Sequence, residues 1–146
     1  MRRAPLLAAL ALALPLGTAG CFFWEPYTRK DTLPDPGTVA PSQAIRLAPG
    51  QDMPGEIACE TGFCQQWYRI DVPQPGVLRV DVAIGVADPP IARAVLHDGQ
   101  GNVLARANTE QGTTLRVEAA VDAGPAALLV QSGKGRLPYT VSVSLE

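Results

Sequence analysis

Alternation of apolar and polar residues dominates the chain from about residue 65 onward. In QQWYRIDV, the residues Tyr68, Ile70 and Val72 share one face of an extended chain, and Trp67 and Arg69 share the other. A two-residue period of this kind is typical of a strand with one buried face. The same period recurs in GVLRVDVAIG, TTLRVEAA and PYTVSVSLE, so the pattern predicts strands in all four stretches.

Three shorter apolar stretches, IARAVLHD, NVLARAN and AALLVQS, lie between these strands. Turn-forming sequences separate the pieces: PQPG at 73–76, DGQGN at 98–102, DAGP at 122–125 and GKG at 133–135. Fourteen prolines and fourteen glycines interrupt any long helix. The spacing of about ten residues between turns therefore predicts an all-β fold over residues 42–146, a small antiparallel β-sandwich of jelly-roll-like form.

The first twenty residues have a different character. Arg2 and Arg3 precede an apolar run that ends at Leu16, and the small residues 18–20 follow it. This is the layout of a secretory signal, and the run is shorter than the roughly 20 apolar residues that span a bilayer. We therefore expect residues 1–20 to be a signal peptide. Export by the twin-arginine route is a weaker alternative, because the residues that normally flank the arginine pair are missing.

Cys21 follows this segment directly, in LPLGTAGCFFWEPY. The stretch resembles the lipobox of bacterial lipoproteins, although Thr18 stands where a branched apolar residue is usual. The resemblance implies lipidation of Cys21, anchorage in membrane lipid, and the outer membrane as the address, since Phe22 is not the aspartate that retains lipoproteins at the inner membrane. Several acyl chains on one residue would make the anchor stable. The alternative is an ordinary secreted protein in which Cys21 is a free or bridging thiol.

Residues 21–41 contain four prolines among charged residues and show no apolar period. Such a segment buries too little surface to fold alone, so it predicts a Pro-rich flexible tether after the lipidated cysteine. Beyond it, CETGFC places Cys59 and Cys64 close enough in sequence to form a disulfide that closes a short loop. An oxidising compartment favours such a bond. Zinc is the rival interpretation, but His97 is the chain's one histidine and there is no second cysteine pair.

The order of the strands and turns resembles the bacterial pre-peptidase C-terminal (PPC) domain, a small β-sandwich found beside secreted proteases. The resemblance covers about residues 42–146 and implies a fold rather than a function. Where family members often have an aromatic pair, this chain has Pro125, Ala126 and Ala127, and the acidic calcium cluster of collagen-binding relatives is reduced to Asp31 and Asp35. The matching positions are Trp67, Tyr68, Asp98, Gly101, Leu104, Ala105, Gly124, Tyr139 and Val143.

The net charge and the types of residue available limit the functions that the chain can have. The formal net charge of −2 becomes about −4 without Arg2 and Arg3, which argues against nucleic acid as a partner. His97 is the only candidate general base, and its place at a strand end is typical of a surface histidine. The carboxylates are expected on outward positions and turns, as solvated charges. We therefore predict no catalytic residue, no metal and no cofactor. These carboxylates are Asp71, Asp81, Glu118 and Asp122.

Three functional hypotheses follow. The first is a lipid-anchored envelope protein whose non-catalytic module binds a protein or a glycan. The second is an accessory or inhibitory subunit of a separate secreted hydrolase, and the third is a small hydrolase. Trp67, expected on the outward face of its strand, is the candidate binding contact, because aromatic side chains often dominate interfaces. Alternatively, Trp67 covers one edge of the sheet.

Overall fold

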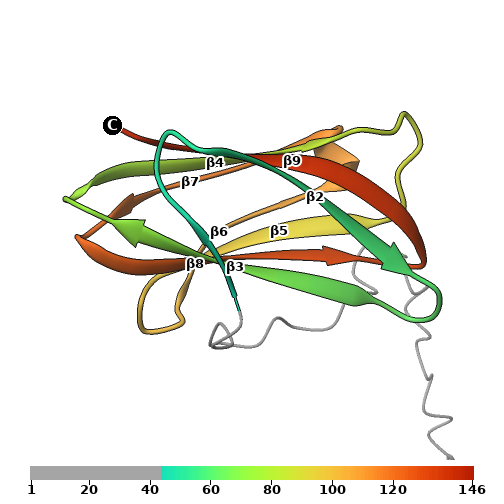
Figure 1. Ribbon diagram of the computed structural model, residues 1–146, viewed down its shortest axis with the longest axis horizontal. Coiled ribbons are helices and arrows are strands. Elements are labelled where there is room, and N and C mark those ends of the chain that lie inside the picture. The colour runs from blue at the N-terminus through green and yellow to red at the C-terminus, as the bar shows by residue number, and fades with distance from the viewer. Residues whose placement is uncertain (1–43) are drawn as a thin grey trace, which may run out of the picture. The chain divides into compact units, whose positions relative to one another are not determined.

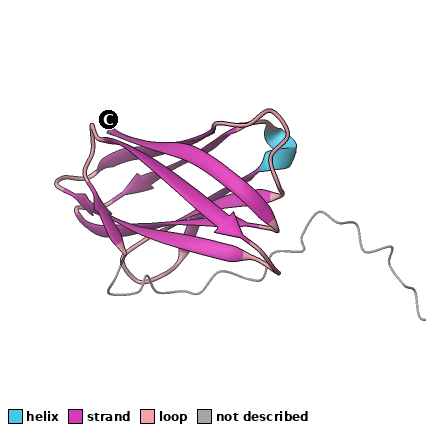
Figure 2. Ribbon diagram, turned by 45° about the vertical axis from the view of Figure 1, so that its right-hand side comes forward, coloured by secondary structure: helices cyan, strands magenta, loops and turns pink. Residues whose placement is uncertain are grey.

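The computed structural model describes residues 44–146, which form two β-sheets packed face to face (Figure 1). The part of the chain described contains one short 3₁₀ helix, η2 (Thr109–Gln111), and no helix long and apolar enough to cross a membrane. Figure 2 shows the helix at one end of the strands. The strands are β1 (Ile45–Leu47), β2 (Asp52–Cys59), β3 (Cys64–Val72), β4 (Gly76–Ile84), β5 (Ala92–His97), β6 (Val103–Asn108), β7 (Thr114–Val121), β8 (Gly124–Ser132) and β9 (Gly135–Leu145).

Sheet A has the strand order β1-β3-β8-β5-β6, and sheet B has the order β2-β9-β4-β7. All neighbouring strands are antiparallel except β1 and β3, which pair in parallel over three residues. The last two strands of the chain, β8 and β9, occupy inner positions of the two sheets. The structure therefore confirms the predicted all-β sandwich, with β1 as the one parallel exception among the described strands.

The core between the sheets is built from the alternation seen in the sequence. In β4, for example, Leu78, Val80 and Val82 are fully buried, whereas Arg79 and Asp81 point to the opposite side. Burial of one such aliphatic side chain contributes about 1.5–3 kcal/mol, so these inward rows supply most of the stability of the fold. Sheet A contributes Tyr68, Ile70, Ala94, Leu96, Leu128 and Val130 to the same core, and sheet B adds Leu115, Val117, Leu137, Val141 and Val143.

Two tyrosines connect the sheets inside this core. The hydroxyl groups of Tyr68 on β3 and Tyr139 on β9 lie 2.7 Å apart and satisfy each other, and the two rings meet edge to face. Burial raises the pKa of both phenols. Gly55 on β2 lies directly against the pair, since a Cβ at this position would stand 2.8 Å from atoms of both tyrosines. A glycine is therefore required here by space and not by backbone conformation.

The alternation pattern did not reveal β1 and β2. β1 has only three residues, and β2 contains Pro54 and Gly55, which the sequence pattern associates with loops. Proline is tolerated here because β2 lies at the edge of sheet B. The expected signal peptide, residues 1–20, and the expected tether, residues 21–41, lie outside the described residues.

Candidate functional site

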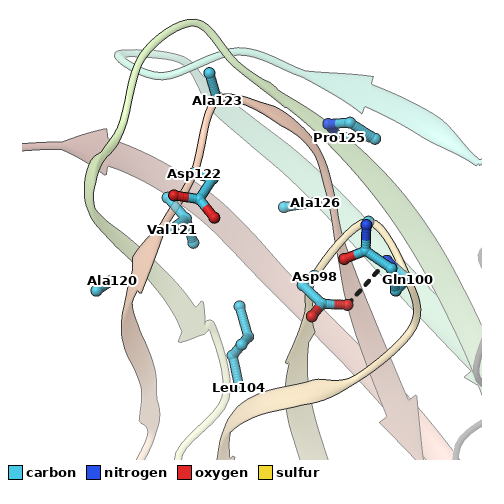
Figure 3. A pocket seen from close by; sticks show the side chains of 10 residues that line it. Asp98, Gln100, Leu104, Ala120, Val121, Asp122, Ala123, Pro125 and Ala126 are labelled. Carbon is cyan, nitrogen blue, oxygen red and sulfur yellow. Dashed lines mark hydrogen bonds between the residues drawn. The ribbon is translucent and has the colours of Figure 1, made fainter.

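One end of the sandwich has a pocket of about 240 Å³ between two hairpins (Figure 3). The β5–β6 connection forms one wall and the β7–β8 connection forms the other. The sequence did not predict this pocket, because it arises from the mutual approach of two turns that are distant in the chain. Its lining consists of Asp98, Gly99, Gln100, Leu104, Ala120, Val121, Asp122, Ala123, Pro125 and Ala126.

Asp98 holds the first wall in place. One carboxylate oxygen accepts hydrogen bonds from the backbone N–H groups of Gln100 and Asn102, at 2.9 and 2.8 Å, and the other accepts from the Asn102 side-chain amide at 2.8 Å. Gly101, with φ of 86°, allows the tight reversal that brings these donors together. The hydrogen bonds from Asn102 lower the pKa of Asp98 below its usual value. Asp98 is therefore an ionised turn-forming residue, and its oxygens are already engaged.

The two walls touch at Gly99 and Pro125. A Cβ on Gly99 would lie 2.9 Å from the Pro125 carbonyl oxygen and 3.1 Å from its ring, so only glycine permits this approach. Gly124 has φ of 130° at the start of β8, a conformation that side chains rarely adopt. The departure from the PPC pattern at Pro125 thus forms part of the pocket wall.

Asp122 supplies the second carboxylate of the pocket. Figure 3 shows its side chain on the β7–β8 side, with Leu104 opposite and Val121 and Ala126 nearby. Asp122 is exposed, and the surrounding side chains are small and apolar. This combination suits a ligand group with an aliphatic stem and a positively charged end, because the stem can contact the apolar wall while the charge faces the carboxylate.

The remaining predicted carboxylates lie elsewhere. Asp81 on β4 accepts hydrogen bonds from the Arg116 guanidinium at 2.7 and 3.0 Å, and Glu118 on β7 accepts from Arg79 at 2.7 Å. Asp71 pairs with its neighbour Arg69 on β3. These carboxylates therefore lie on outward faces, as predicted. Among residues 44–146, no group of three or more His, Cys, Asp and Glu side chains is arranged to hold a metal ion.

His97 is not a surface residue, contrary to the prediction. It ends β5 on the outer face of sheet A, is 1% exposed, and neither ring nitrogen has a hydrogen-bond partner. Its ring centroid lies 5.3 Å from that of Trp67. Burial, followed by the nearby positive charge of Arg106, lowers the pKa of His97, so the ring is neutral near pH 7. His97 does not line the pocket, although its neighbour Asp98 does.

The burial of Trp67 contradicts a second prediction, that this side chain is exposed. Its side chain points outward from sheet A as the alternation required, but it is only 6% exposed. It packs with Val95, Ala127 and Leu129, and we call these four residues the outer cluster. A side chain this buried is not an exposed binding contact. The prediction assumed that an outward-facing side chain meets solvent, which does not hold for this face.

The predicted disulfide is confirmed. Cys59 at the end of β2 and Cys64 at the start of β3 are bonded, with Cα atoms 5.6 Å apart. The bond joins sheet B to sheet A across a short turn in which Gly62 has φ of 70°. Closure of so short a loop stabilises the fold by about 2 kcal/mol through the unfolded state. The predicted lipidation residue, Cys21, lies outside the described residues.

Comparison with known proteins shows the fold. No family model and no curated protein matches the chain. Among solved structures, it is similar to the pre-peptidase C-terminal domain of a Bacillus anthracis collagenase, with 20% identity, a TM-score of 0.58, and coverage of 73% of this chain and 99% of that one. It also matches Aeromonas hydrophila PliG, a periplasmic inhibitor of g-type lysozyme, with 16% identity, a TM-score of 0.45, and coverage of 70% and 97%. The first similarity shows a fold like that of a PPC domain, as the sequence pattern implied.

Proposed function

We propose that this protein is an envelope lipoprotein, anchored to the outer membrane through Cys21, whose non-catalytic β-sandwich binds a protein partner. The observation that supports the binding role is the pocket between the β5–β6 and β7–β8 hairpins. Its walls are fixed by the Asp98 hydrogen bonds and by the close approach of Gly99 and Pro125. A preformed pocket loses little entropy on binding, which favours recognition.

The chemistry of the pocket supports binding without catalysis. Asp98 accepts three hydrogen bonds and has a lowered pKa, so it is poorly suited to accept a proton. Asp122 is the second carboxylate, and no histidine, cysteine or serine lines the pocket. Nucleophilic mechanisms of the Ser–His or Cys–His kind need such a group, and an acid–base pair of two carboxylates would need Asp98 to take up a proton.

A protein fits this pocket better than a glycan does. Sugar binding generally uses an aromatic surface, and the lining residues include no aromatic side chain. A lysine or arginine side chain fits the apolar wall and Asp122. Even full burial of four methylenes supplies only about 3 kcal/mol, and an exposed ion pair adds about 1 kcal/mol or less. That sum corresponds to roughly millimolar affinity, so the pocket would select the partner within a larger interface.

Charge reversal tests the binding role. Asp122→Lys changes an exposed pocket residue, and Asp88→Lys makes the same change in the exposed β4–β5 loop, at the other end of the strands. Partners crosslinked to the full-length protein in intact envelopes are identified by mass spectrometry. We expect Asp122→Lys to lose a partner that wild type and Asp88→Lys both retain. Equal recovery with all three would refute the pocket as the binding site.

The identity of the recovered partner separates the functional hypotheses. A secreted hydrolase whose activity changes when the purified sandwich is added would establish the accessory role. Recovery of glycan in place of protein would refute the protein-binding proposal. Loss of binding in Asp122→Lys together with loss of a measured hydrolytic activity would favour the enzyme alternative.

The anchor is tested by intact mass and membrane fractionation of wild type beside Cys21→Ser. Wild type should lack residues 1–20 and carry acyl chains, and it should fractionate with the outer membrane. Cys21→Ser should be unacylated and leave that fraction. A soluble, unacylated wild type would overturn the lipoprotein proposal while leaving the pocket unaffected.

A further inference from the structure

The outer face of sheet A is apolar and buried, which is unusual for the outside of a two-sheet sandwich. Val95 and Leu129 of the outer cluster are 0% exposed, and Trp67 and Ala127 are 6% and 8% exposed. All four side chains point away from sheet B, because their neighbours in the strands, such as Leu96 and Leu128, fill the core between the sheets. Something other than sheet B must cover this face.

The described elements do not supply this cover. Each strand within residues 44–146 belongs to one of the two sheets, and η2 lies against β7 of sheet B. The long β4–β5 loop turns toward the end of the sandwich, where Ile91 contacts Gly133 and Pro90 contacts Gly135. No strand or helix within residues 44–146 therefore lies over the outer cluster.

The chain enters the described part of the structure at this same face. Ala44 is half-buried and packs against the outer cluster. It is followed directly by β1, which pairs with β3, the strand that holds Trp67. The residues immediately before Ala44 therefore start beside the cluster and need no long path to reach it.

The preceding segment has the chemistry that this face requires. Residues 31–43, DTLPDPGTVAPSQ, provide Leu33 and Val39 as apolar groups and Asp31 and Asp35 as acidic groups. Alternation and pairing place four arginines on the outer face of sheet A, where Asp71 is the one carboxylate among the described residues of its strands. These arginines are Arg46, Arg69, Arg93 and Arg106.

The length of the segment is also sufficient. Thirteen extended residues reach up to about 43 Å. Five strands spaced about 4.8 Å apart make a face roughly 20 Å wide. The segment can therefore cross the whole sheet once and still connect to the residues before it.

We propose that residues 31–43 lie across the outer face of sheet A and cover the outer cluster, with their acidic residues facing the arginines of that face. The sandwich thus has a third layer, built from its own N-terminal extension. The residues before 31 then act as the connector between this layer and the N-terminal part of the chain. This inference does not depend on lipidation of Cys21 or on the pocket.

Trp67 reports directly on this contact. In a Trp24→Phe background, Trp67 is the only tryptophan of the full-length chain. Residues 31–43 are replaced by a Gly/Ser sequence of equal length, and residues 22–30 are replaced in the same way as a control. We expect the first replacement to raise acrylamide quenching of Trp67 severalfold and to shift its emission to longer wavelength. The control should leave Trp67 shielded.

Other occupants give different results. Unchanged quenching after replacement of residues 31–43 would overturn the proposal. Loss of shielding on dilution of wild type would assign the face to a second copy of the chain. Loss of shielding in Cys21→Ser, released from lipid and with residues 31–43 intact, would assign it to the membrane. Each of these outcomes is incompatible with cover by residues 31–43.

A second measurement decides the matter if the replaced chain does not fold. A photo-crosslinking amino acid is placed at Val39 in the otherwise native chain, and a control carries it at Phe22. We expect the Val39 probe to form adducts with peptides from β3, β5 or β8 of the same chain. Adducts only with sheet B, only between chains, or none at all would overturn the proposal.

Discussion

The outer faces of the two sheets differ sharply, although both belong to one small sandwich. On sheet B, exposed cross-strand ion pairs cover the surface: Arg79 with Glu118, Arg116 with Asp81, and Arg136 with Glu56. On sheet A, the equivalent positions form the buried outer cluster, with His97 beside it. Sheet B thus has one buried face and one face that meets solvent, as is usual in a sandwich. The middle of sheet A is buried on both faces.

The difference shows that the direction of a side chain and its exposure are separate properties. Val77 on β4 and Val95 on β5 both point away from the core between the sheets, yet they are 37% and 0% exposed. What distinguishes them is the outer face on which each side chain lies. The same kind of change should therefore have different effects on the two faces.

Introducing a charge should give the largest difference. Ala127→Lys places an ammonium group in the outer cluster, where it lacks water, and should cost about 3–5 kcal/mol of unfolding free energy. Ala83→Lys adds the same group to the solvated face of sheet B and should change it by less than about 0.5 kcal/mol. Urea unfolding measures both. Similar values for the two variants would contradict the difference between the faces.

Truncating a valine should give a smaller effect of the same kind. Val95→Ala removes two buried methyl groups and should destabilise the fold by about 2 kcal/mol. Val77→Ala removes the same groups from the exposed position on sheet B and should cost less than about 1 kcal/mol. The midpoints of denaturant unfolding compare the two variants, provided that the unfolding free energy depends on denaturant with the same slope in both. A cost for Val77→Ala as large as that for Val95→Ala would contradict it.

Acid should weaken the fold through His97. The folded pKa lies below the ordinary 6.5 because of burial, so the unfolded chain binds the proton more strongly. Stability is therefore greatest above pH 6.5 and falls as the pH decreases toward the folded pKa. Arg106 adds to this effect, and Asp98 opposes it. Thermal unfolding across this range should show a decline in wild type and a flatter profile in His97→Leu.

His97 is the only histidine of the chain, so the comparison isolates one group. Asp98 also titrates, but its lowered pKa places its contribution in more acidic solution, where stability is lost as the carboxylate is protonated. Equal slopes for wild type and His97→Leu between neutral pH and about pH 5 would show that His97 is not sealed from water.

Removing an ion pair from sheet B should give the smallest effect. Arg116→Gln breaks the pair with Asp81, whose partners are 59% and 27% exposed in their side chains. Exposed pairs of this kind contribute little, because water and salt screen them. We expect an unfolding midpoint within experimental error of wild type, at low and at high salt. A clear loss would mean that sheet B also depends on its outer face.

Much of the fold could be predicted from the sequence, because four strands alternate cleanly. The apolar run AALLVQS in β8 held further information. Ala127 and Leu129 are apolar at outward positions while Leu128 and Val130 are apolar at inward ones, which is typical of a strand covered on both sides. This run was the signal that the outer face of sheet A is buried, and with it Trp67 and His97.

The pocket could not be predicted in the same way. Asp98 and Gly101 indicate a turn, and Gly124 and Pro125 indicate another, but nothing local shows that the two turns meet. Their contact depends on β5 and β8 pairing side by side in sheet A. Likewise, β2 was hidden because Pro54 and Gly55 are acceptable only at an edge position next to the tyrosine pair.

The inner positions of β8 and β9 have a consequence for when the protein can fold. β8 lies between β3 and β5, and β9 lies between β2 and β4, so neither sheet can close before the last two strands have been synthesised. Tyr68 must likewise wait for Tyr139, 71 residues later. A growing chain therefore has no stable folded part to form early, and such long-range pairing is slow. Completion of the sandwich is therefore set by the synthesis of its C-terminal strands.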